Sequence, residues 1–70
     1  MPKLYPSSHI IKVLIQHGFV FISQKGSHAK FRKDGEPTLT VIVPANRKEI
    51  PIGTFRSILR QSLLSEGDFK

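Results

Sequence analysis

The sequence contains no cysteine and no long apolar run, and each absence removes a class of protein. Without cysteine the chain can form neither a disulfide nor a thiolate zinc site, which favours a reducing compartment and makes the cytoplasm the expected location. The apolar runs are far too short to span a membrane, and residues 1–18 lack the uninterrupted apolar stretch of a secretory signal. We therefore expect a protein that is neither secreted nor embedded in a membrane.

Acidic residues are scarce, and the first half of the chain has none. The sequence holds 11 Lys and Arg against 5 Asp and Glu, which gives a formal net charge of +6. Residues 34–70 contain five cations and five acids, so the entire excess lies in residues 1–33. A basic field of this kind attracts polyanions, and nucleic acid is the first candidate. A solvated basic surface without a ligand is the simpler alternative.

The length of the chain indicates one domain. A chain of 70 residues cannot bury two separate cores, and its 39% hydrophobic and 23% charged residues are ordinary for a small globular protein. We therefore expect residues 1–70 to form a single domain that folds alone with a modest stability margin.

The N-terminal part of the chain has the spacing of an amphipathic helix. Residues 6–8, "PSS", are a helix-start signal in which a serine is expected to cap the first turn. The apolar residues of "HIIKVLIQHG" then recur at helical spacing, and Gly18 supplies a stop. This pattern predicts a helix of about ten residues that ends near His17.

The pattern becomes helical again from about Thr54, after the irregular polar loop "PANRKEIPIG". Thr54 or Gly53 is expected to cap this second helix. The tail "SEGDFK" is expected to add one more turn, whose Phe69 packs back against the core. The apolar stripe of the second helix comprises Phe55, Ile58, Leu59 and Leu63.

Between the two helices, three short segments have the composition and alternation of β-strands. They read "FVFISQ", "HAKFRK" and "TLTVIV", and turn signals at residues 25–27 and 34–37 separate them. In the middle segment, Ala29 and Phe31 point one way while His28, Lys30 and Arg32 point the other. We therefore expect an antiparallel meander in which one histidine and two cations share a row.

The predicted fold class is α+β, in the order α-β-β-β-α, with both helices on one face of a three-stranded antiparallel sheet. The inner face would bury Ala29 and Phe31 with apolar partners from the flanking strands, and the row that contains His28 would face solvent or a ligand. Double-stranded RNA-binding domains have the same order of elements and read the shape of a duplex. The order of elements therefore adds weight to an RNA ligand.

The sequence shows no metal site and no serine or cysteine nucleophile. His9 and His17 are eight residues apart instead of three or four, so both are expected to be surface or half-buried helix residues. No strand-turn-helix serine motif is present, and the acids have no paired spacing that would indicate a site. No metal and no cofactor are therefore expected.

His28 is the remaining candidate for chemistry. RNA carries its own nucleophile, the 2′-hydroxyl, so an enzyme that cleaves RNA needs only to move protons and to stabilise the charged phosphate. An imidazole titrates near neutral pH and suits the proton transfer. A structural or phosphate-binding histidine is the alternative that the residues alone leave open. The neighbours that could bind phosphate or admit a ligand are Lys25, Gly26, Ser27, Lys30 and Arg32.

Several stretches, taken in their order and spacing, resemble the HicA toxin family, also called YcfA-like. They are "KGSHAKF", the strand ending "VIVP", and "KEIPIGTFRSILRQSLLSEGDF", and the resemblance covers nearly the whole chain up to Phe69. It implies a toxin of a HicAB toxin-antitoxin system, with a fold like that of double-stranded RNA-binding domains. It further implies an mRNA interferase that cuts RNA without a metal through the histidine of "GSH", here His28. The implied partner is a HicB-type antitoxin that binds the toxin and blocks this histidine.

The chain departs from the family pattern in the loop after the third strand. Relatives often carry another histidine after the proline that corresponds to Pro44, where this chain reads "PANRK" and has Asn46 nearby. This loop therefore does not offer an obvious second proton carrier, and Lys30 or a water would have to serve.

Three functions remain to be distinguished. The main hypothesis is a ribonuclease toxin with His28 as general acid or base and Ser27 as an orienting hydroxyl. A non-catalytic RNA-binding module would use the same basic face only for phosphates. A protein-interaction subunit would use it to meet an acidic partner. The expected phosphate-binding residues are Lys25, Lys30 and Arg32, with Arg56 and Arg60 as more distant contacts to the RNA backbone.

Overall fold

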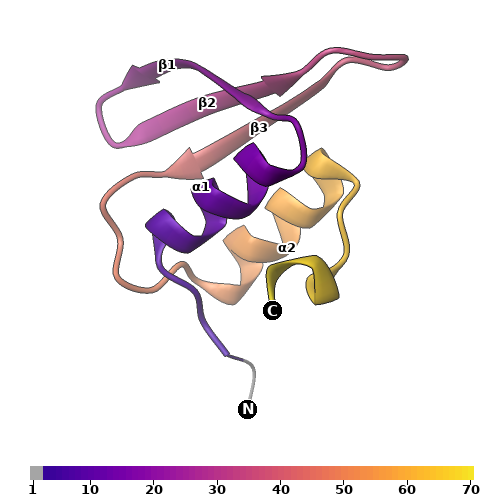
Figure 1. Ribbon diagram of the computed structural model, residues 1–70. Coiled ribbons are helices and arrows are strands. Elements are labelled where there is room, and N and C mark those ends of the chain that lie inside the picture. The colour runs from indigo at the N-terminus through magenta and orange to yellow at the C-terminus, as the bar shows by residue number, and fades with distance from the viewer. Residues whose placement is uncertain (1–2) are drawn as a thin grey trace.

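The strands form an antiparallel meander, as predicted. In the computed structural model, which describes residues 3–70, β1 (Val20–Lys25), β2 (His28–Lys33) and β3 (Leu39–Pro44) lie in the order β1-β2-β3 (Figure 1). A tight turn at residues 26–27 joins the first two strands. β2 is the central strand and pairs with a neighbour on each side.

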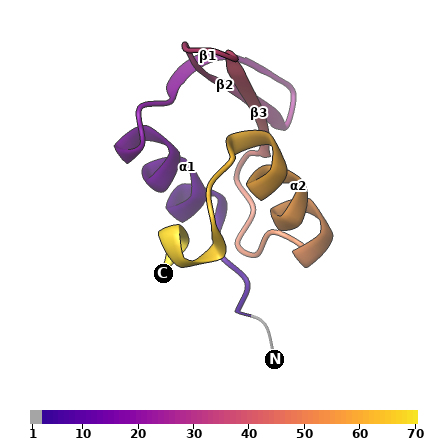
Figure 2. The same ribbon diagram turned by 90° about the vertical axis from the view of Figure 1, so that its right-hand side faces the viewer.

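Two α-helices, α1 (Ser7–Gln16) and α2 (Ile52–Ser62), cover one side of this sheet, and a 3-10 turn, η1 (Glu66–Phe69), follows. Figure 1 and Figure 2 show both helices on the same side of the strands. α1 has the predicted length, and Gly18 after it has a φ of 94°, the left-handed conformation that favours glycine. The α+β class and the order α-β-β-β-α are thus confirmed. In the described part of the chain, no helix is long and apolar enough to cross a membrane.

The core lies between the helices and the inner face of β2 and β3. Ala29 and Phe31 of β2 are buried there with Val41 and Val43 of β3. β1 adds no buried residue, because the helices pack under the β3 side of the sheet. The prediction of apolar partners from both flanking strands is therefore confirmed for β3, whereas β1 contributes Phe21, which meets Phe31 edge-on but stays half exposed. The rest of the core comprises Tyr5, Ile10, Val13, Leu14, Phe19, Ile50, Phe55, Ile58 and Phe69.

Helix α1 begins without the predicted serine cap. Pro6 is the N-cap residue, and no side chain makes a capping hydrogen bond. The Ser7 hydroxyl instead donates a hydrogen bond to the Pro44 carbonyl oxygen at 2.6 Å and accepts one from the Arg47 backbone N–H at 2.9 Å. Ser7 is buried, so these bonds fix the start of α1 to the end of β3 where water competes little.

Helix α2 differs from the prediction at both ends. Its N-cap residue is Pro51, so the caps expected at Gly53 and Thr54 are wrong. Proline is tolerated at this position because the N–H that it lacks would have no partner within the helix. At the other end Leu63 leaves the predicted apolar stripe, since its φ of 60° takes the chain out of the helix and its side chain is 70% exposed.

The tail packs back against the core, as predicted. Phe69 is fully buried, and its ring meets Phe55 edge-on with the ring centroids 5.2 Å apart. His9 Nε2 donates a hydrogen bond to the Phe69 carbonyl oxygen, and the His9 ring stacks on Tyr5. Tyr5 is itself buried, so the segment before α1 belongs to the helical layer.

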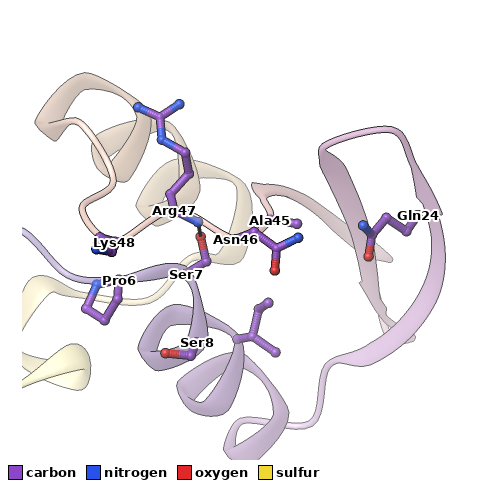
Figure 3. Close-up of a pocket in the computed structure, with 9 residues that line it drawn as sticks. Pro6, Ser7, Ser8, Gln24, Ala45, Asn46, Arg47 and Lys48 are labelled. Atoms are coloured by element: carbon purple, nitrogen blue, oxygen red, sulfur yellow. Dashed lines mark hydrogen bonds between the residues drawn. The ribbon is translucent and has the colours of Figure 1, made fainter.

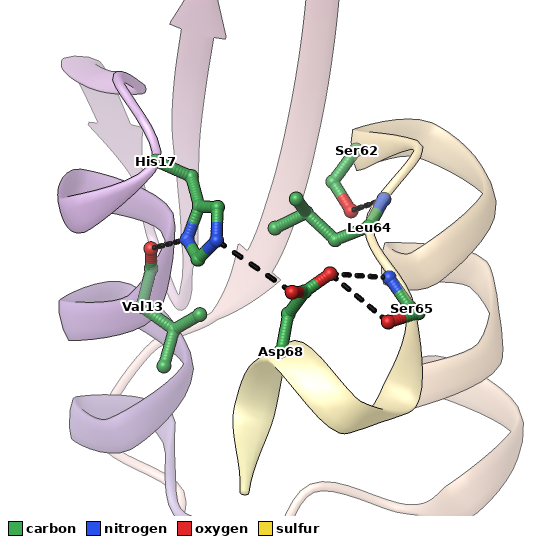
Figure 4. A network of polar contacts seen from close by, with 6 residues as sticks. All are labelled: Val13, His17, Ser62, Leu64, Ser65 and Asp68. Carbon is green, nitrogen blue, oxygen red and sulfur yellow. Dashed lines mark hydrogen bonds and ion pairs between the residues drawn. The ribbon is translucent and has the colours of Figure 1, made fainter.

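A polar network joins the end of α1 to η1 (Figure 4). One oxygen of Asp68 accepts hydrogen bonds from the Ser65 backbone N–H at 2.8 Å and from the Ser65 hydroxyl at 3.0 Å. The other oxygen lies 3.8 Å from Nε2 of His17, whose Nδ1 lies 2.9 Å from the Val13 carbonyl oxygen. The hydrogen bond from the Ser65 backbone, followed by that from its hydroxyl, lowers the pKa of Asp68 below its ordinary value.

We expect acid to weaken this junction. A carboxyl whose pKa is lower in the folded than in the unfolded chain adds stability above its unfolded pKa, and this contribution is lost as the pH falls through the folded value. Urea unfolding should therefore show a loss of stability below about pH 4 that is smaller in Asp68→Asn. Glu36→Gln, which removes an exposed carboxyl before β3, is the matched control. If Asp68→Asn lost as much stability in acid as wild type, the acid sensitivity could not be assigned to Asp68.

Candidate nucleic-acid interface

One face of β2 presents a histidine and two cations to solvent. His28, Lys30 and Arg32 are exposed, whereas Ala29 and Phe31 between them are buried. This alternation follows from the pleat of the strand, in which successive side chains leave opposite faces of the sheet. The predicted row is confirmed, and it lies on the face that the helices leave open. We refer to His28, Lys30 and Arg32 as the basic row.

The pairing register places another cation beside the histidine. Lys25 of β1 lies directly opposite His28, and Ser23 lies opposite Lys30. Residues directly opposite in antiparallel strands have Cβ atoms about 4.5–5.5 Å apart, so the side chains of Lys25 and His28 leave the sheet next to each other and on the same face. On the other side His28 lies opposite Pro44, which carries no charge.

The tight turn Gly26-Ser27 holds His28 at the start of β2. Gly26 has a φ of 60°, and apart from its two chain neighbours no residue has an atom within 4 Å of the position where its side chain would begin. Its carbonyl oxygen accepts a hydrogen bond from the Gln24 side-chain amide at 3.1 Å, and the Ser27 carbonyl oxygen accepts one from the Ala45 N–H at 2.6 Å. The backbone at Gly26 is therefore open to a ligand, beside a histidine on an anchored turn.

The charges on the hairpin formed by β1 and β2 favour binding of an anion. Residues 20–33 contain four cations and no acid. Arg32 Nε lies 3.3 Å from Oδ1 of Asp34, and both side chains are exposed. An exposed pair of this kind is worth at most about 1 kcal/mol, so a phosphate can replace the carboxylate on Arg32.

The start of α1, Gln24 and the loop after β3 form a pocket beside the same end of the sheet (Figure 3). The pocket measures about 500 Å³ and is lined in part by Gln24, Asn46, Arg47 and Lys48. Asn46 has a φ of 58°, a left-handed conformation that asparagine tolerates better than most residues. The sequence predicts only a polar loop here. The signal that could have located the pocket is the Asn-Arg-Lys run at residues 46–48, close after the end of β3. Because β2 and β3 are antiparallel, this end of β3 lies beside the turn that precedes His28.

Comparison with known protein families identifies the family of the chain. A family model described as "HicA toxin of bacterial toxin-antitoxin" matches residues 7–64. The chain belongs to the HicA toxin family. The match to HicA toxins runs from the first residue of α1 past the end of α2 and includes the whole basic row. No match was found among curated proteins. The family assigns the chain a toxin role and implies an antitoxin as its partner.

In this HicA toxin, the two arginines of α2 do not share a face with the basic row. Arg56 and Arg60 are exposed, and Arg60 Nη2 donates a hydrogen bond to Ser57 Oγ at 3.1 Å. The Gln61 side-chain oxygen accepts the Ile42 N–H at 3.0 Å, so α2 reaches the edge of β3 from the inner side of the sheet. Because α2 packs against the inner side of the sheet and the basic row lies on its outer face, a ligand that meets both has to pass around an edge of the sheet.

The other histidines of the toxin support its fold. His9 and His17 are half-buried, as predicted, and both are held by contacts to backbone carbonyl oxygens. Within residues 3–70, no group of three or more His, Cys, Asp or Glu side chains is arranged to hold a metal ion. His28 is therefore the histidine that is placed to meet a ligand.

The hairpin brings most of the predicted site residues together. An exposed imidazole can exchange a proton with a bound molecule, while the cations beside it hold an anion in place. This arrangement suits chemistry on a phosphodiester. The site residues on the hairpin are Lys25, Gly26, Ser27, His28, Lys30 and Arg32.

Proposed function

We propose that this toxin is a metal-independent endoribonuclease, an mRNA interferase, in which His28 transfers a proton. The observation that carries the proposal is the position of His28, which is exposed at the end of the basic row with Lys25 directly opposite. In this proposal His28 of β2 carries the proton and Lys25 of the neighbouring strand β1 binds the phosphate, and their cross-strand pairing supports the two roles. The order of elements, shared with double-stranded RNA-binding domains, is consistent with an RNA substrate.

The proposed reaction uses the 2′-hydroxyl of RNA as the nucleophile. Its oxygen attacks the adjacent phosphorus and the bond to the 5′-oxygen of the next nucleotide breaks, so one proton is lost and another is gained. His28 acts as general base for the first transfer or as general acid for the second, which contributes about 100- to 10,000-fold. Lys30 or a water carries the other proton. Lys25 stabilises the charge that develops on the phosphate.

The hairpin cations are proposed to bind the RNA backbone. Lys30 and Arg32 follow the histidine along β2 in steps of about 6.6 Å, so an RNA strand lying along β2 meets them in succession. Ser27 orients the phosphate through its hydroxyl or amide, and Gly26 allows the RNA to approach the backbone closely. More distant contacts to the RNA backbone are proposed for Arg56 and Arg60.

The proposed partners are messenger RNA and a HicB-type antitoxin, and the proposed location is the cytoplasm. Loss of transcripts would arrest growth. An antitoxin that shields the basic row is expected to present acidic side chains to Lys30 and Arg32, because complementary charge steers and orients protein partners. No cofactor is proposed.

Incubation of a labelled transcript with the purified toxin in excess EDTA tests the proposal. We expect the transcript to be cut by the native toxin and left intact by heat-denatured toxin. A transcript that is shifted on a native gel but stays intact over a long incubation would identify a non-catalytic RNA-binding module. If the toxin neither shifts nor cuts the transcript, the remaining function for the basic surface is interaction with a protein.

Removing both charges of the row by Lys30→Gln with Arg32→Gln is expected to weaken RNA binding and antitoxin binding together. Each phosphate contact that is lost makes the slope of log affinity against log salt shallower by about 0.7 for a single strand. Fluorescence anisotropy over a range of salt concentrations measures this change. Lys12→Gln, at an exposed lysine of α1, is the matched control and should alter neither affinity. An unchanged antitoxin affinity in the double variant would remove the proposed contact between antitoxin acids and the row.

A further inference from the structure

Three large apolar side chains are exposed in succession on the edge strand β1. Val20, Phe21 and Ile22 are 57%, 56% and 38% exposed. Soluble proteins seldom leave such a run on an edge strand in water, because exposed apolar strands associate with other chains. A surface of this kind indicates a partner.

The fold leaves both faces of β1 open. Val20 pairs with Arg32 and therefore lies on the outer face, whereas Phe21 pairs with Phe31 and lies on the inner face. Phe21 contacts the core only through an edge-on approach to Phe31, with ring centroids 5.8 Å apart. The helices pack under the β3 side of the sheet, and β1 lies at the opposite edge (Figure 1, Figure 2). Within residues 3–70, the neighbours of these three residues cover them only in part and leave at least 38% of each exposed.

A bulge in β1 favours contact through side chains over addition of a strand. The pairing with β2 shifts between Phe21 and Ser23, so Ile22 is an extra residue on β1. A bulge bends the strand and interrupts the regular spacing of its free N–H and C=O groups, which disfavours pairing along that edge. The apolar side chains of residues 20–22 are therefore the part of β1 that a partner can bind.

The charge around β1 selects the kind of partner. Four cations and no acid lie within residues 20–33, and neighbouring strands are only about 4.8 Å apart. A protein seated on Val20 therefore also faces the cation of Arg32 beside it. A second copy of this chain would bring two hairpins of the same charge together, which opposes self-association. An acidic protein instead gains attraction from the same cations.

We infer that β1 is the surface on which the antitoxin docks, through an apolar segment flanked by Asp or Glu. The inference rests on the proposed function, because it takes its partner from a toxin-antitoxin pair. An antitoxin bound to residues 20–22 would lie over the neighbouring basic row and keep RNA away from Lys30 and Arg32. Apolar contact supplies most of the affinity, whereas the charges orient the antitoxin and speed its association.

The affinity for the cognate HicB-type antitoxin, measured by isothermal titration calorimetry, tests this inference. The variant Val20→Thr with Ile22→Thr keeps β-branched side chains, and hence the strand preference, but removes apolar surface. We expect it to bind the antitoxin about 100-fold more weakly than wild type and to cut RNA at the wild-type rate. The matched control is Leu63→Asn, which removes a 70% exposed leucine at a left-handed position that asparagine accepts. Its antitoxin affinity should equal that of wild type.

A second measurement needs no variant. Amide hydrogen exchange at residues 20–25 of the wild-type toxin should slow when the antitoxin is added. Unchanged exchange there, or unchanged affinity of the double variant, overturns the inference. A toxin dimer that the double variant dissociates, with antitoxin affinity unaltered, would assign β1 to self-association instead. If the affinity for the antitoxin does not fall as the NaCl concentration is raised, the inference that Asp or Glu residues flank the apolar segment is wrong.

The two proposals fail separately in these experiments. If the wild-type toxin leaves RNA intact while the double variant loses antitoxin affinity, the ribonuclease activity is wrong and the docking surface stands. If RNA is cut and the affinity is unchanged, the activity stands and the docking surface is wrong.

Discussion

His28→Ala is expected to lower the rate of RNA cleavage by about 100- to 10,000-fold, the usual contribution of a positioned general acid or base. The fold should survive the change, because His28 is exposed and its position depends on the turn and the strand pairing. Cleavage of a labelled transcript in excess EDTA measures the effect, and circular dichroism verifies that the variant is folded.

His17→Ala is the matched control, because it removes a half-buried histidine from the helical layer and leaves the sheet unchanged. It should cut RNA at the wild-type rate. Equal cleavage by wild type and His28→Ala would mean that another residue or a contaminant is responsible. If neither protein cuts and both bind RNA, the toxin is better described as an RNA-binding module.

The variant Phe69→Ala is expected to lower the free energy of unfolding by about 3–5 kcal/mol. Phe69 is fully buried and packs edge-on against Phe55, so alanine would leave a cavity between η1 and α2. Because a small domain has only about 5–15 kcal/mol in total, this loss would remove a large part of the stability. Urea unfolding followed by circular dichroism measures it.

Phe21→Ala tests whether burial causes that loss. It removes the same ring from β1, where the side chain is 56% exposed, and should cost clearly less. Equal losses in the two variants would show that the tail does not close the core in solution.

The order of elements and the exposed row are the parts of the structure that the sequence specifies most directly. A strand has only two faces, so the apolar residues Ala29 and Phe31 determine that His28 faces away from the core. Helical spacing locates α1 in the same way, because its apolar face has to meet a sheet that supplies the other half of the core. Both predictions depend on local periodicity alone.

The features that the sequence does not reveal depend on contacts between distant segments. Ser7 has the side chain of a helix cap, but the Pro44 carbonyl and the Arg47 N–H lie close enough to bond it instead. Leu63 has the spacing of the apolar stripe, and only the left-handed turn after Ser62 directs it into solvent.

Local sequence patterns also do not predict that β1 is exposed. The composition of "FVFISQ" predicts a strand with a buried side, whereas burial depends on how far the helical layer extends under the sheet. The same reasoning applies to the pocket formed by Gln24 and the loop after β3. Its walls come from three segments that only the folded chain brings together.

The contact from His9 to the Phe69 carbonyl has a consequence for the kinetics of folding. It joins residues 60 positions apart in the chain, whereas the strands of the meander pair with their immediate neighbours. Long-range contacts form late, because a large loop has to close before they contribute any stability. The hairpin that carries His28 can therefore begin to assemble while the helical layer is still open. Docking of η1 against α1 is expected to follow pairing of β1 with β2, so a newly made toxin would form the strand pair that carries His28 before its own core has closed.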